Sequence, residues 1–303
     1  PLGFLASPCN PAGHSFSSSS PISFGKPASA NIPQPADKMR PFFHLLRLWL
    51  IQLRYAATRE LAFRANFFVW VIVELSWFVL QLAFVDVVYQ HVDSIAGWSR
   101  PQMIVLVATN QLIQQIFTAF LMPGLVKLPE LVRDGKLDFV LLKPAPPQFL
   151  ISTSQLEIGP LANALIAMAV VVFGLQELQI TPSLPSILLY GPLILAGLLT
   201  HYALLLSLVS LTFWIVQAES VLLGYYSIFQ VARLPREAAT GWFRIFFTFA
   251  LPLLLVANIP AATLLHGFQI LPILLFLLTC LTAALFASLF FHLGLRRYQS
   301  ASS

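Results

Sequence analysis

Charged residues are scarce in this sequence. Of its 303 residues only 10% are Asp, Glu, Lys or Arg, whereas 58% are hydrophobic. A water-soluble globular chain carries about 25% charged residues and roughly 45–50% apolar residues. A surface with so few charges lacks the polar coat that water requires. The composition therefore predicts an integral membrane protein, with the lipid bilayer as its solvent.

Cysteine is nearly absent, and the short motifs of common catalytic sites are missing. Cys9 and Cys280 lie far apart, one in a polar tail and one in an apolar run, which excludes a disulfide framework and a paired-cysteine metal site. The sequence contains no G-x-x-x-x-G-K-[ST] phosphate loop, no H-E-x-x-H and no G-x-S-x-G. We therefore predict no catalytic, cofactor-binding or metal-binding residues. Any active transport must draw on an ion gradient or on a separate ATPase.

The first 38 residues differ from the rest of the chain. They are rich in Pro, Ser and Ala, carry little charge and show no periodicity, which predicts disorder. They lack the basic segment and apolar core of a secretory signal. Because Met39 resembles a natural start, we expect 1–38 to be non-native and 39–303 to form a single transmembrane domain. The net charge of +5 does not indicate nucleic acid, because the basic residues do not cluster.

Six stretches have the length and apolarity of membrane-spanning helices, which need about 20 residues to cross the hydrocarbon. They are 66–89, 101–123, 155–176, 187–216, 241–265 and 270–293. The predicted fold class is thus all-α, with six transmembrane helices.

An amphipathic helix is predicted before the first span, over residues 42–64. Its apolar residues recur at helical spacing and its basic residues fall on another face, as is typical of a helix lying in the membrane interface. The apolar set is Phe42, Leu46, Trp49, Leu50 and Leu53, and the polar set is Arg40, His44, Arg47 and Arg54.

Lys and Arg are distributed unevenly among the connections. From Met39 onward one set of connections holds Arg40, Arg47, Arg54, Arg59, Arg64, Lys127, Arg133, Lys136, Lys143, Arg233, Arg236, Arg244, Arg296 and Arg297, and the opposite set holds only Arg100. By the positive-inside rule, both termini are predicted to be cytoplasmic. The segregation also favours an even number of spans, and six in particular.

The connection 125–143 is long for a turn between two spans. Its charged residues alternate with apolar ones, which predicts a short amphipathic helix that ends at Gly135 and a second segment that ends at Pro144. The apolar residues Leu131, Val132 and Leu137 are predicted to fill a groove on a partner. Charged residues are predicted to lie at the rim of that interface and to fix how the partner is aligned on it. They are Glu130, Arg133, Asp134, Lys136 and Asp138.

The fifth stretch contains prolines that interrupt a helix. Pro252 lies inside it, and Asn258 and Pro260 lie near its outer end. Proline removes an intrahelical hydrogen bond, which membrane helices tolerate where protein or water satisfies the freed carbonyls. The outer part is therefore predicted to be broken or re-entrant and to face the protein interior.

Several polar residues lie within the predicted spans. The candidates for a translocation pathway are Glu74, Asn110, Gln111, Gln114, Gln115 and His201. A carboxylate at this depth is costly, so Glu74 must face the bundle, water or a partner, and we favour a pathway role. For the amides, interhelical hydrogen bonding and pathway lining both fit. A lone histidine is more often packed and hydrogen-bonded than a proton relay.

The sequence resembles the membrane subunits of type-2 ATP-binding-cassette (ABC-2) exporters, in particular a small six-span bacterial subgroup. The residues that carry the resemblance are Gly97-Trp98, Gly135-Lys-Leu-Asp138, Leu141-Leu-Lys-Pro144, Arg233-Leu-Pro235, Trp242-Phe-Arg244, Leu251-Pro252 and Ile259-Pro260-Ala261. Together with the order of the apolar stretches, they cover Met39 to the C-terminus.

The resemblance implies a permease in the bacterial plasma membrane that works with a separate ATPase subunit, which binds ATP and Mg. It implies that the ATPase docks on 125–143, that an outer gate lies at 252–265, and that two permeases assemble, identical or different. It does not imply a substrate. A proton-coupled secondary transporter using Glu74 and His201 is the alternative, although the two halves show no repeat. A membrane enzyme or scaffold is less favoured, because no catalytic constellation is present.

Overall fold

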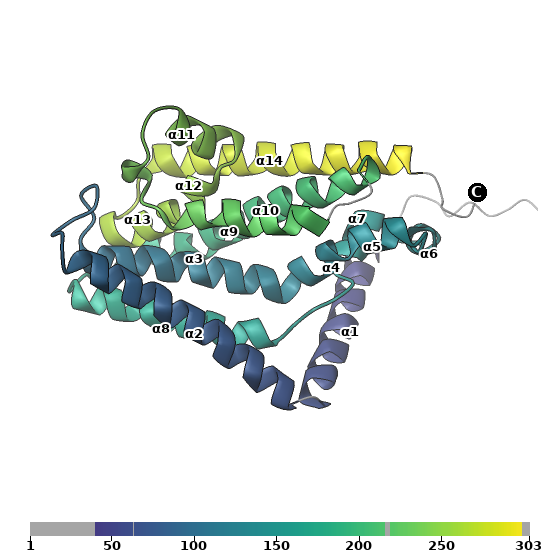
Figure 1. The fold of residues 1–303 in the computed structure, drawn as a ribbon, viewed down its shortest axis with the longest axis horizontal. Coiled ribbons are helices and arrows are strands. Elements are labelled where there is room, and N and C mark those ends of the chain that lie inside the picture. The colour runs from purple at the N-terminus through teal and green to yellow at the C-terminus, as the bar shows by residue number, and fades with distance from the viewer. Residues whose placement is uncertain (1–39, 63, 216–218, 299–303) are drawn as a thin grey trace, which may run out of the picture. The chain divides into compact units, whose positions relative to one another are not determined.

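The computed structural model describes residues 40–62, 64–215 and 219–298, so the disorder predicted for 1–38 lies outside the described residues. The chain divides into two compact units, 1–41 and 42–303. The described part of the second unit is helical, and an isolated bridge between Ile95 and Trp98 is its only β-type pairing (Figure 1).

The helices follow one another in short and long pieces. In chain order they are α1 (Arg40–Ala62), α2 (Arg64–Tyr89), α3 (Arg100–Phe120), α4 (Met122–Val126), α5 (Leu128–Arg133), α6 (Leu137–Leu141), α7 (Pro147–Ser152), α8 (Gly159–Glu177), α9 (Leu184–Ser210), η1 (Leu211–Phe213), α10 (Glu219–Phe229), η2 (Gln230–Arg233), η3 (Arg236–Ala238), α11 (Gly241–Ile245), the π-helical η4 (Phe246–Ala250), α12 (Leu253–Val256), α13 (Asn258–His266) and α14 (Ile270–Arg297).

Five of these segments are long and apolar enough to cross a bilayer within the described ranges. They are Phe67–Tyr89, Arg100–Phe120, Gly159–Glu177, Leu184–Phe213 and Ile270–Arg297. A sixth candidate is the pair Gly241–Ala250 and Leu253–His266, which is bent by 72°. The predicted all-α membrane fold is confirmed.

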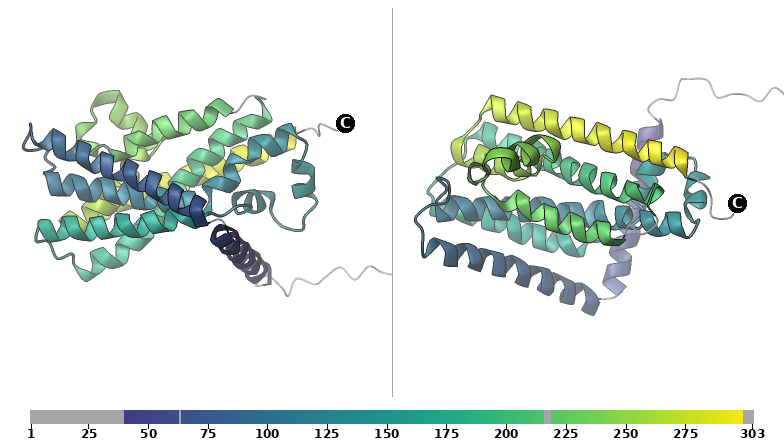
Figure 2. Two further views of the ribbon diagram at one scale, coloured as in Figure 1. Left: turned by 60° about the horizontal axis from the view of Figure 1, so that its bottom comes forward. Right: turned by 45° about the horizontal axis from the view of Figure 1, so that its top comes forward.

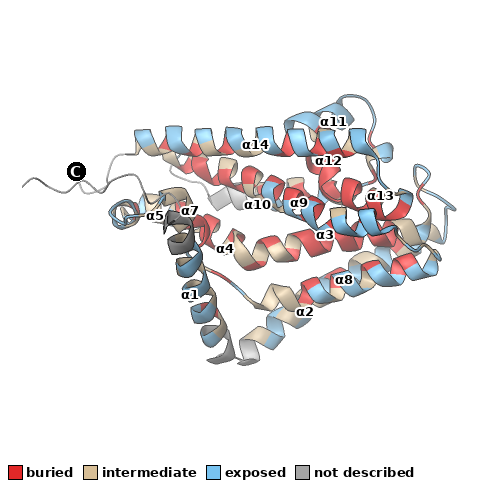
Figure 3. Cartoon of the chain, turned by 180° about the vertical axis from the view of Figure 1, so that it is seen from behind, coloured by how far each residue is buried: buried red, intermediate tan, exposed pale blue. Residues whose placement is uncertain are grey.

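Helix α3 forms the centre of the bundle, and α2 lies at its edge. Within the 18-residue apolar stretch of each helix, 78% of the α3 residues are buried but only 11% of the α2 residues (Figure 3). Helix α8 lies close against α3 because Gly174 has no side chain: a Cβ there would come within 2.7 Å of Val105 Cγ2. The outward faces of α2 and α14 expose large apolar side chains such as Trp77 and Leu289, as suits contact with lipid.

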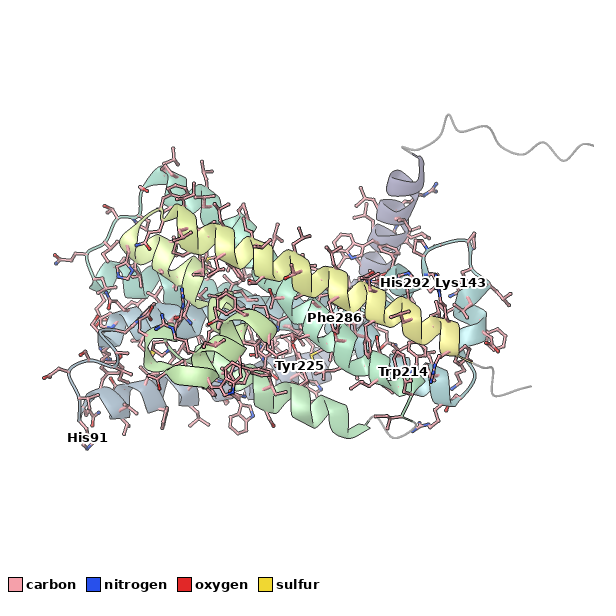
Figure 4. The ribbon with its side chains drawn as sticks, turned by 90° about the horizontal axis from the view of Figure 1, so that it is seen from above. His91, Lys143, Trp214, Tyr225, Phe286 and His292 are labelled. Atoms are coloured by element: carbon pink, nitrogen blue, oxygen red, sulfur yellow. The ribbon has the colours of Figure 1, made fainter. Side chains whose placement is uncertain are left out.

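The bundle has two ends, which we name after residues on them. The Trp98 end carries the connection between α2 and α3, including His91. The Lys143 end carries α4 to α7. Figure 4 shows His91 at one end of the bundle and Lys143 and His292 toward the other, and Figure 2 shows the long helices running between the two ends.

The fifth crossing is made by α10 and η2, and not by the predicted stretch 241–265. From α10 to η3 the chain follows α3 in antiparallel order from the Lys143 end to the Trp98 end. Three hydrogen bonds mark this path: Tyr226 Oη to Met122 Sδ (3.7 Å), Arg233 Nη2 to Gln114 Oε1 (3.2 Å) and Trp98 Nε1 to Glu237 Oε2 (2.9 Å). The number of crossings remains six, but the prediction of 241–265 as a span is wrong.

The segment from α11 to α13 is a re-entrant hairpin at the Trp98 end. The chain enters it just after Glu237, which hydrogen-bonds Trp98, and leaves it at His266, whose ring lies 6.3 Å from the Trp98 ring. The 72° bend occurs at Leu251 and Pro252, where the helix is broken. The predicted break at Pro252 is therefore confirmed, and the buried α12 and α13 face the protein interior as predicted.

The new path corrects the positions of three arginines that the sequence placed with the Lys143-end connections. Arg233 lies inside the bundle against Gln114, Arg236 lies next to Glu237 at the Trp98 end, and Arg244 lies in the first limb of the hairpin. The sequence hides this crossing because α10 and η2 are short and contain glutamine and arginine. The mean hydropathy over about 19 residues, by which membrane spans are recognised, is therefore too low to identify such a segment.

Cysteine labelling tests the corrected topology. In a background without the native cysteines, we expect Cys at Ala238 to react with a membrane-impermeant maleimide from the same side as Cys at Ser94, because η3 lies at the Trp98 end. A cysteine at Leu142, which is 81% exposed at the other end, serves as the opposite-side control. Labelling of the Ala238 position from the Leu142 side would restore the sequence-based topology.

The predicted helix before the first span is confirmed as α1. Its Trp49 ring lies 5.7 Å from the ring of Phe120 at the end of α3, so α1 contacts the Lys143 end. Leu46, Leu50 and Ile51 remain exposed on the helix. Its location in the membrane interface stays a prediction.

Candidate functional site

A cavity of about 640 Å³ lies at the Lys143 end, where α2, the end of α3, the start of α8 and α10 meet. One part of its wall is apolar and aromatic, and another is polar or acidic. It is lined by Phe67, Trp70, Val71, Glu74, Gln115, Thr118, Met122, Pro123, Val126, Gln155, Glu157, Gly159, Pro160, Asn163 and Tyr226. The volume lies within the range of small-molecule sites.

Two of the predicted pathway residues meet in this cavity. Gln115 Nε2 donates a hydrogen bond to Glu74 Oε2 at 3.2 Å, which holds the carboxylate of α2 against α3. A second carboxylate, Glu157, lies just before α8, where its backbone N–H donates to the Ala119 carbonyl at 2.9 Å. Asn163 is 3% exposed, and neither polar atom of its side chain has a hydrogen-bond partner.

Gln114 belongs to a different group of side chains, around Arg233. The guanidinium donates to Gln114 Oε1 at 3.2 Å and to Gln230 Oε1 on its own turn. The carboxamide of Gln81, with its oxygen toward the guanidinium, accepts from Nη1 and Nη2 at 3.1 and 3.3 Å. Arg233 thus joins α2, α3 and η2 through neutral carboxamides. We call these four residues the arginine clamp.

The remaining pathway candidates lie away from the cavity. Asn110 and Gln111 are buried inside α3, and both polar atoms of the Asn110 side chain lack partners. His201 is fully buried, with its ring stacked 3.5 Å from that of Phe229 and its Nδ1 3.0 Å from the Tyr225 hydroxyl. His201 is therefore a packed residue, as the sequence favoured. It shares no hydrogen-bond partner with Glu74.

A second, apolar cavity of about 310 Å³ lies between α9, α10, η4 and α14. Its lining includes Tyr225, Phe249 and Phe286, and Figure 4 shows Tyr225 and Phe286 near the middle of the bundle. Ala250 and Leu251, at the turn of the re-entrant hairpin, form part of its lining. Its described lining residues include no Asp, Glu, Lys, Arg or His.

The three residues predicted to form an outer gate have separate structural roles. Pro252 is buried at the break between η4 and α12. Asn258 clips the hairpin to the fifth crossing, because its Nδ2 donates to the Leu234 carbonyl and its Oδ1 accepts from the Arg236 N–H, both at 2.9 Å. Pro260 lies in the first turn of α13, where proline is tolerated, and does not interrupt that helix. The gating role stays a prediction.

The connection 125–143 folds as the sequence predicts. Helix α5 ends at Arg133, Gly135 has a positive φ of 68°, and α6 begins at Leu137 and ends before Pro144. A positive φ suits glycine, which has no Cβ to clash. The helix–glycine–helix pattern is confirmed.

The predicted docking role is wrong for Leu137 and stays a prediction for Leu131 and Val132. Leu137 is fully buried within the chain, and Leu131 and Val132 pack against the core cluster at the Lys143 end. Leu137 therefore attaches α6 to the bundle, whereas Leu131 and Val132 are only partly buried. The side chains that do extend outward are Phe139, 70% exposed, and Leu142, 81% exposed. We define the α5–α6 surface as Phe139 and Leu142 together with the charged residues Glu130, Arg133, Asp134, Lys136 and Asp138.

The charged residues of the α5–α6 surface form a network. Lys136 Nζ lies 2.8 Å from Asp134 Oδ2 and 3.8 Å from Glu130 Oε1, and Arg133 Nε lies 3.5 Å from Asp134 Oδ1. The hydrogen bond with Lys136 lowers the pKa of Asp134, and the same bond raises the pKa of Lys136. Both groups therefore stay charged around neutral pH. Asp138 lies in the first turn of α6, where a carboxylate suits the helix dipole.

Sequence reasoning missed several residues of the cavity and the clamp. Glu157 and Asn163 lie in the first part of the predicted third span, 155–176, and were not named there, and Arg233 was counted with a loop. A polar residue inside an apolar stretch was the available signal for Asn163. No sequence signal pairs Gln81 with Arg233.

Within the described ranges no group of three or more His, Cys, Asp or Glu could hold a metal ion. The long apolar helices and the buried central α3 define a multi-pass membrane protein. A profile of ABC-2 family transporter proteins matches residues 75–302, three quarters of the chain, and the chain belongs to this family. Searches of curated proteins and of solved structures found no significant match.

Proposed function

We propose that this permease exports its substrate across the bacterial plasma membrane, driven by ATP hydrolysis in a separate ATPase that docks on the α5–α6 surface. ATP and Mg bind that partner, and two permease chains, identical or different, complete the assembly. In this proposal the Lys143 end and both termini face the cytoplasm. The observation that carries it is an exposed apolar pair, Phe139 and Leu142, beside a charged network at the end of the bundle.

The segment that carries the α5–α6 surface packs against the membrane helices, which would let it transmit a movement to them. Leu125, Leu128 and Leu137 are fully buried. A polar network ties the neighbouring α7 to two long helices: Gln148 Nε2 donates to the Tyr202 hydroxyl of α9 at 2.8 Å, and Ser288 of α14 donates to Gln148 Oε1 at 3.0 Å. A displacement imposed on α5 and α6 would therefore reach α9 and α14.

Proton coupling through Glu74 and His201 gains no support from the geometry. A proton relay requires titratable groups joined by hydrogen bonds or water. Glu74 is bonded to Gln115, whereas His201 is bonded to Tyr225 and stacked on Phe229. The two residues belong to separate groups of side chains.

Co-purification with the ATPase tests the proposal. We expect Phe139→Ala together with Leu142→Ala to weaken ATPase binding about tenfold or more, because a few anchor side chains that an interface buries carry most of its binding free energy. Arg133→Glu with Lys136→Glu should weaken it too, by reversing the charges at the rim.

The matched control is Leu271→Ala with Leu289→Ala on α14, which removes exposed apolar groups of similar size away from the α5–α6 surface. It should leave co-purification unchanged. All variants should insert into the membrane normally. If both α5–α6 variants retain the ATPase and transport at wild-type levels, the α5–α6 surface is only a linker and the proposal fails.

A further inference from the structure

The cavity at the Lys143 end has features that select one chemical class of ligand. Its described lining residues include two carboxylates, Glu74 and Glu157, and no Lys, Arg or His. Phe67, Trp70 and Tyr226 supply aromatic surface. Arg233 interacts electrostatically with Glu74 but does not line the cavity, so an anionic ligand would still meet two carboxylates and no cation in the described lining. A cation with an apolar body would be attracted by charge, by the aromatic faces and by the apolar wall.

The unpartnered Asn163 side chain is an independent sign of a ligand. A buried carboxamide without hydrogen bonds costs free energy. Asn110 also lacks partners, but Asn163 differs from it by lining a cavity that a ligand can enter. Asn163 is 3% exposed and lines the cavity. Its oxygen can accept a hydrogen bond only from a ligand that carries an N–H or O–H donor.

These two observations favour an ammonium group over other cations. A primary ammonium has three N–H donors, which suit the two carboxylates and the Asn163 oxygen. A quaternary ammonium has no donor and would leave Asn163 unsatisfied. A divalent metal ion would require more carboxylate or imidazole ligands than the described residues bring together.

We propose that this cavity binds the ammonium group of amphipathic primary amines, and that such amines are the transported substrates. The substrate assignment rests on the proposed function, whereas the binding site does not. The Glu74 carboxylate, positioned by Gln115, and the Glu157 carboxylate hold the charge, and Asn163 accepts an N–H. Trp70 and Phe67 contact the apolar body. Because the cavity lies at the same end as the α5–α6 surface, substrate would be loaded from the side on which the ATPase acts.

Binding to the purified full-length chain in lipid nanodiscs tests the site without an ATPase. The probes are 4-phenylbutylamine, its N,N,N-trimethyl analogue and 4-phenylbutanol, measured by calorimetry against nanodiscs of lipid alone. We expect saturable binding of the primary amine and at least about tenfold weaker binding of the other two. Hydrogen bonds to charged groups contribute strongly, and neither comparison compound retains both the charge and the donors.

Single substitutions assign the roles. Glu74→Gln and Glu157→Gln should each weaken amine binding about tenfold, because each removes one charge at nearly constant shape. The matched control is Glu177→Gln, whose carboxylate pairs with Arg100 at the Trp98 end, 3.0 Å away. This variant should bind the amine like the wild type.

Asn163→Leu separates a binding role from a structural one. Leucine removes an unsatisfied buried carboxamide, so the Tm should rise, while the affinity for the primary amine should fall and that for the trimethyl analogue should not. A higher Tm with unchanged amine affinity would show that Asn163 binds nothing. Equal affinities for amine and trimethyl analogue, or no saturable binding above lipid alone, would overturn the proposal.

The outcome is distinguishable from failure of the proposed function. If amines do not bind but the ATPase still co-purifies through the α5–α6 surface, the substrate class alone is wrong. If amines bind but the ATPase does not depend on the α5–α6 surface, the cavity stands and the ATP-driven mechanism is wrong.

Discussion

Replacing Gly124, the glycine of α4, with alanine should strongly destabilise the Lys143 end of the bundle. Gly124 lies in the middle of α4 against α7, and a Cβ there would come within 2.8 Å of the Ser152 carbonyl oxygen and still closer to that of Ile151. Backbone atoms cannot rotate away as a side chain can. We expect a loss of about 3 kcal/mol or more, with α4 displaced from α7.

The same substitution at Gly191 is the matched control. Gly191 lies inside α9, and no atom lies within 4 Å of a Cβ built there. Alanine is the better helix former by about 1 kcal/mol, so Gly191→Ala should leave the Tm unchanged or raise it. The Tm of detergent-solubilised protein measures both variants. Equal Tm values for Gly124→Ala and wild type would show that α4 and α7 do not pack as described.

Loss of the Gly124 packing should also reduce ATPase-coupled activity. Because α7 is tied to α9 and α14 through Gln148, separating α4 from α7 would loosen the connection between the α5–α6 surface and the long helices. Transport should therefore fall even in protein that remains in the membrane. Gly191→Ala should transport like the wild type.

Arg233→Leu should destabilise the protein by about 2 kcal/mol. The substitution leaves the half-buried carboxamides of Gln81 and Gln114 facing an apolar side chain, and it removes the link between α2, α3 and η2. Half-buried polar groups that lose a charged partner carry part of the cost of desolvation. The measurement is again the Tm in detergent, together with the yield of inserted protein.

Arg244→Leu is the matched control for the clamp. Arg244 is exposed on α11 and makes no side-chain hydrogen bond or ion pair to a described residue, so its replacement should change the Tm little. The comparison also tests the chain path. If Arg233 lay in an aqueous connection, as the count of basic residues suggested, Arg233→Leu would be as mild as Arg244→Leu.

The sequence alone determined that this is a helical membrane protein. Low charge and long apolar runs predict a helical membrane protein because unsatisfied backbone groups are too costly in lipid. Local chemistry was also sufficient for the break at Pro252, for the two short helices around Gly135 and for α1. These features depend on residues close together in the chain, so a pattern of a few residues predicts them.

Only the tertiary structure decided which residues far apart in the sequence are in contact. The fifth crossing was misassigned because hydropathy measures composition, and α10 and η2 combine apolar residues with an arginine whose partners come from α2 and α3. The same limit explains Leu137: an amphipathic pattern shows that one face is covered, but not whether the chain itself or a partner covers it. Glu74, Glu157 and Asn163 meet in one cavity because the start of α8 returns beside the end of α3. Glu74 is far from Glu157 and Asn163 in the sequence, so no local pattern predicts that they lie close together.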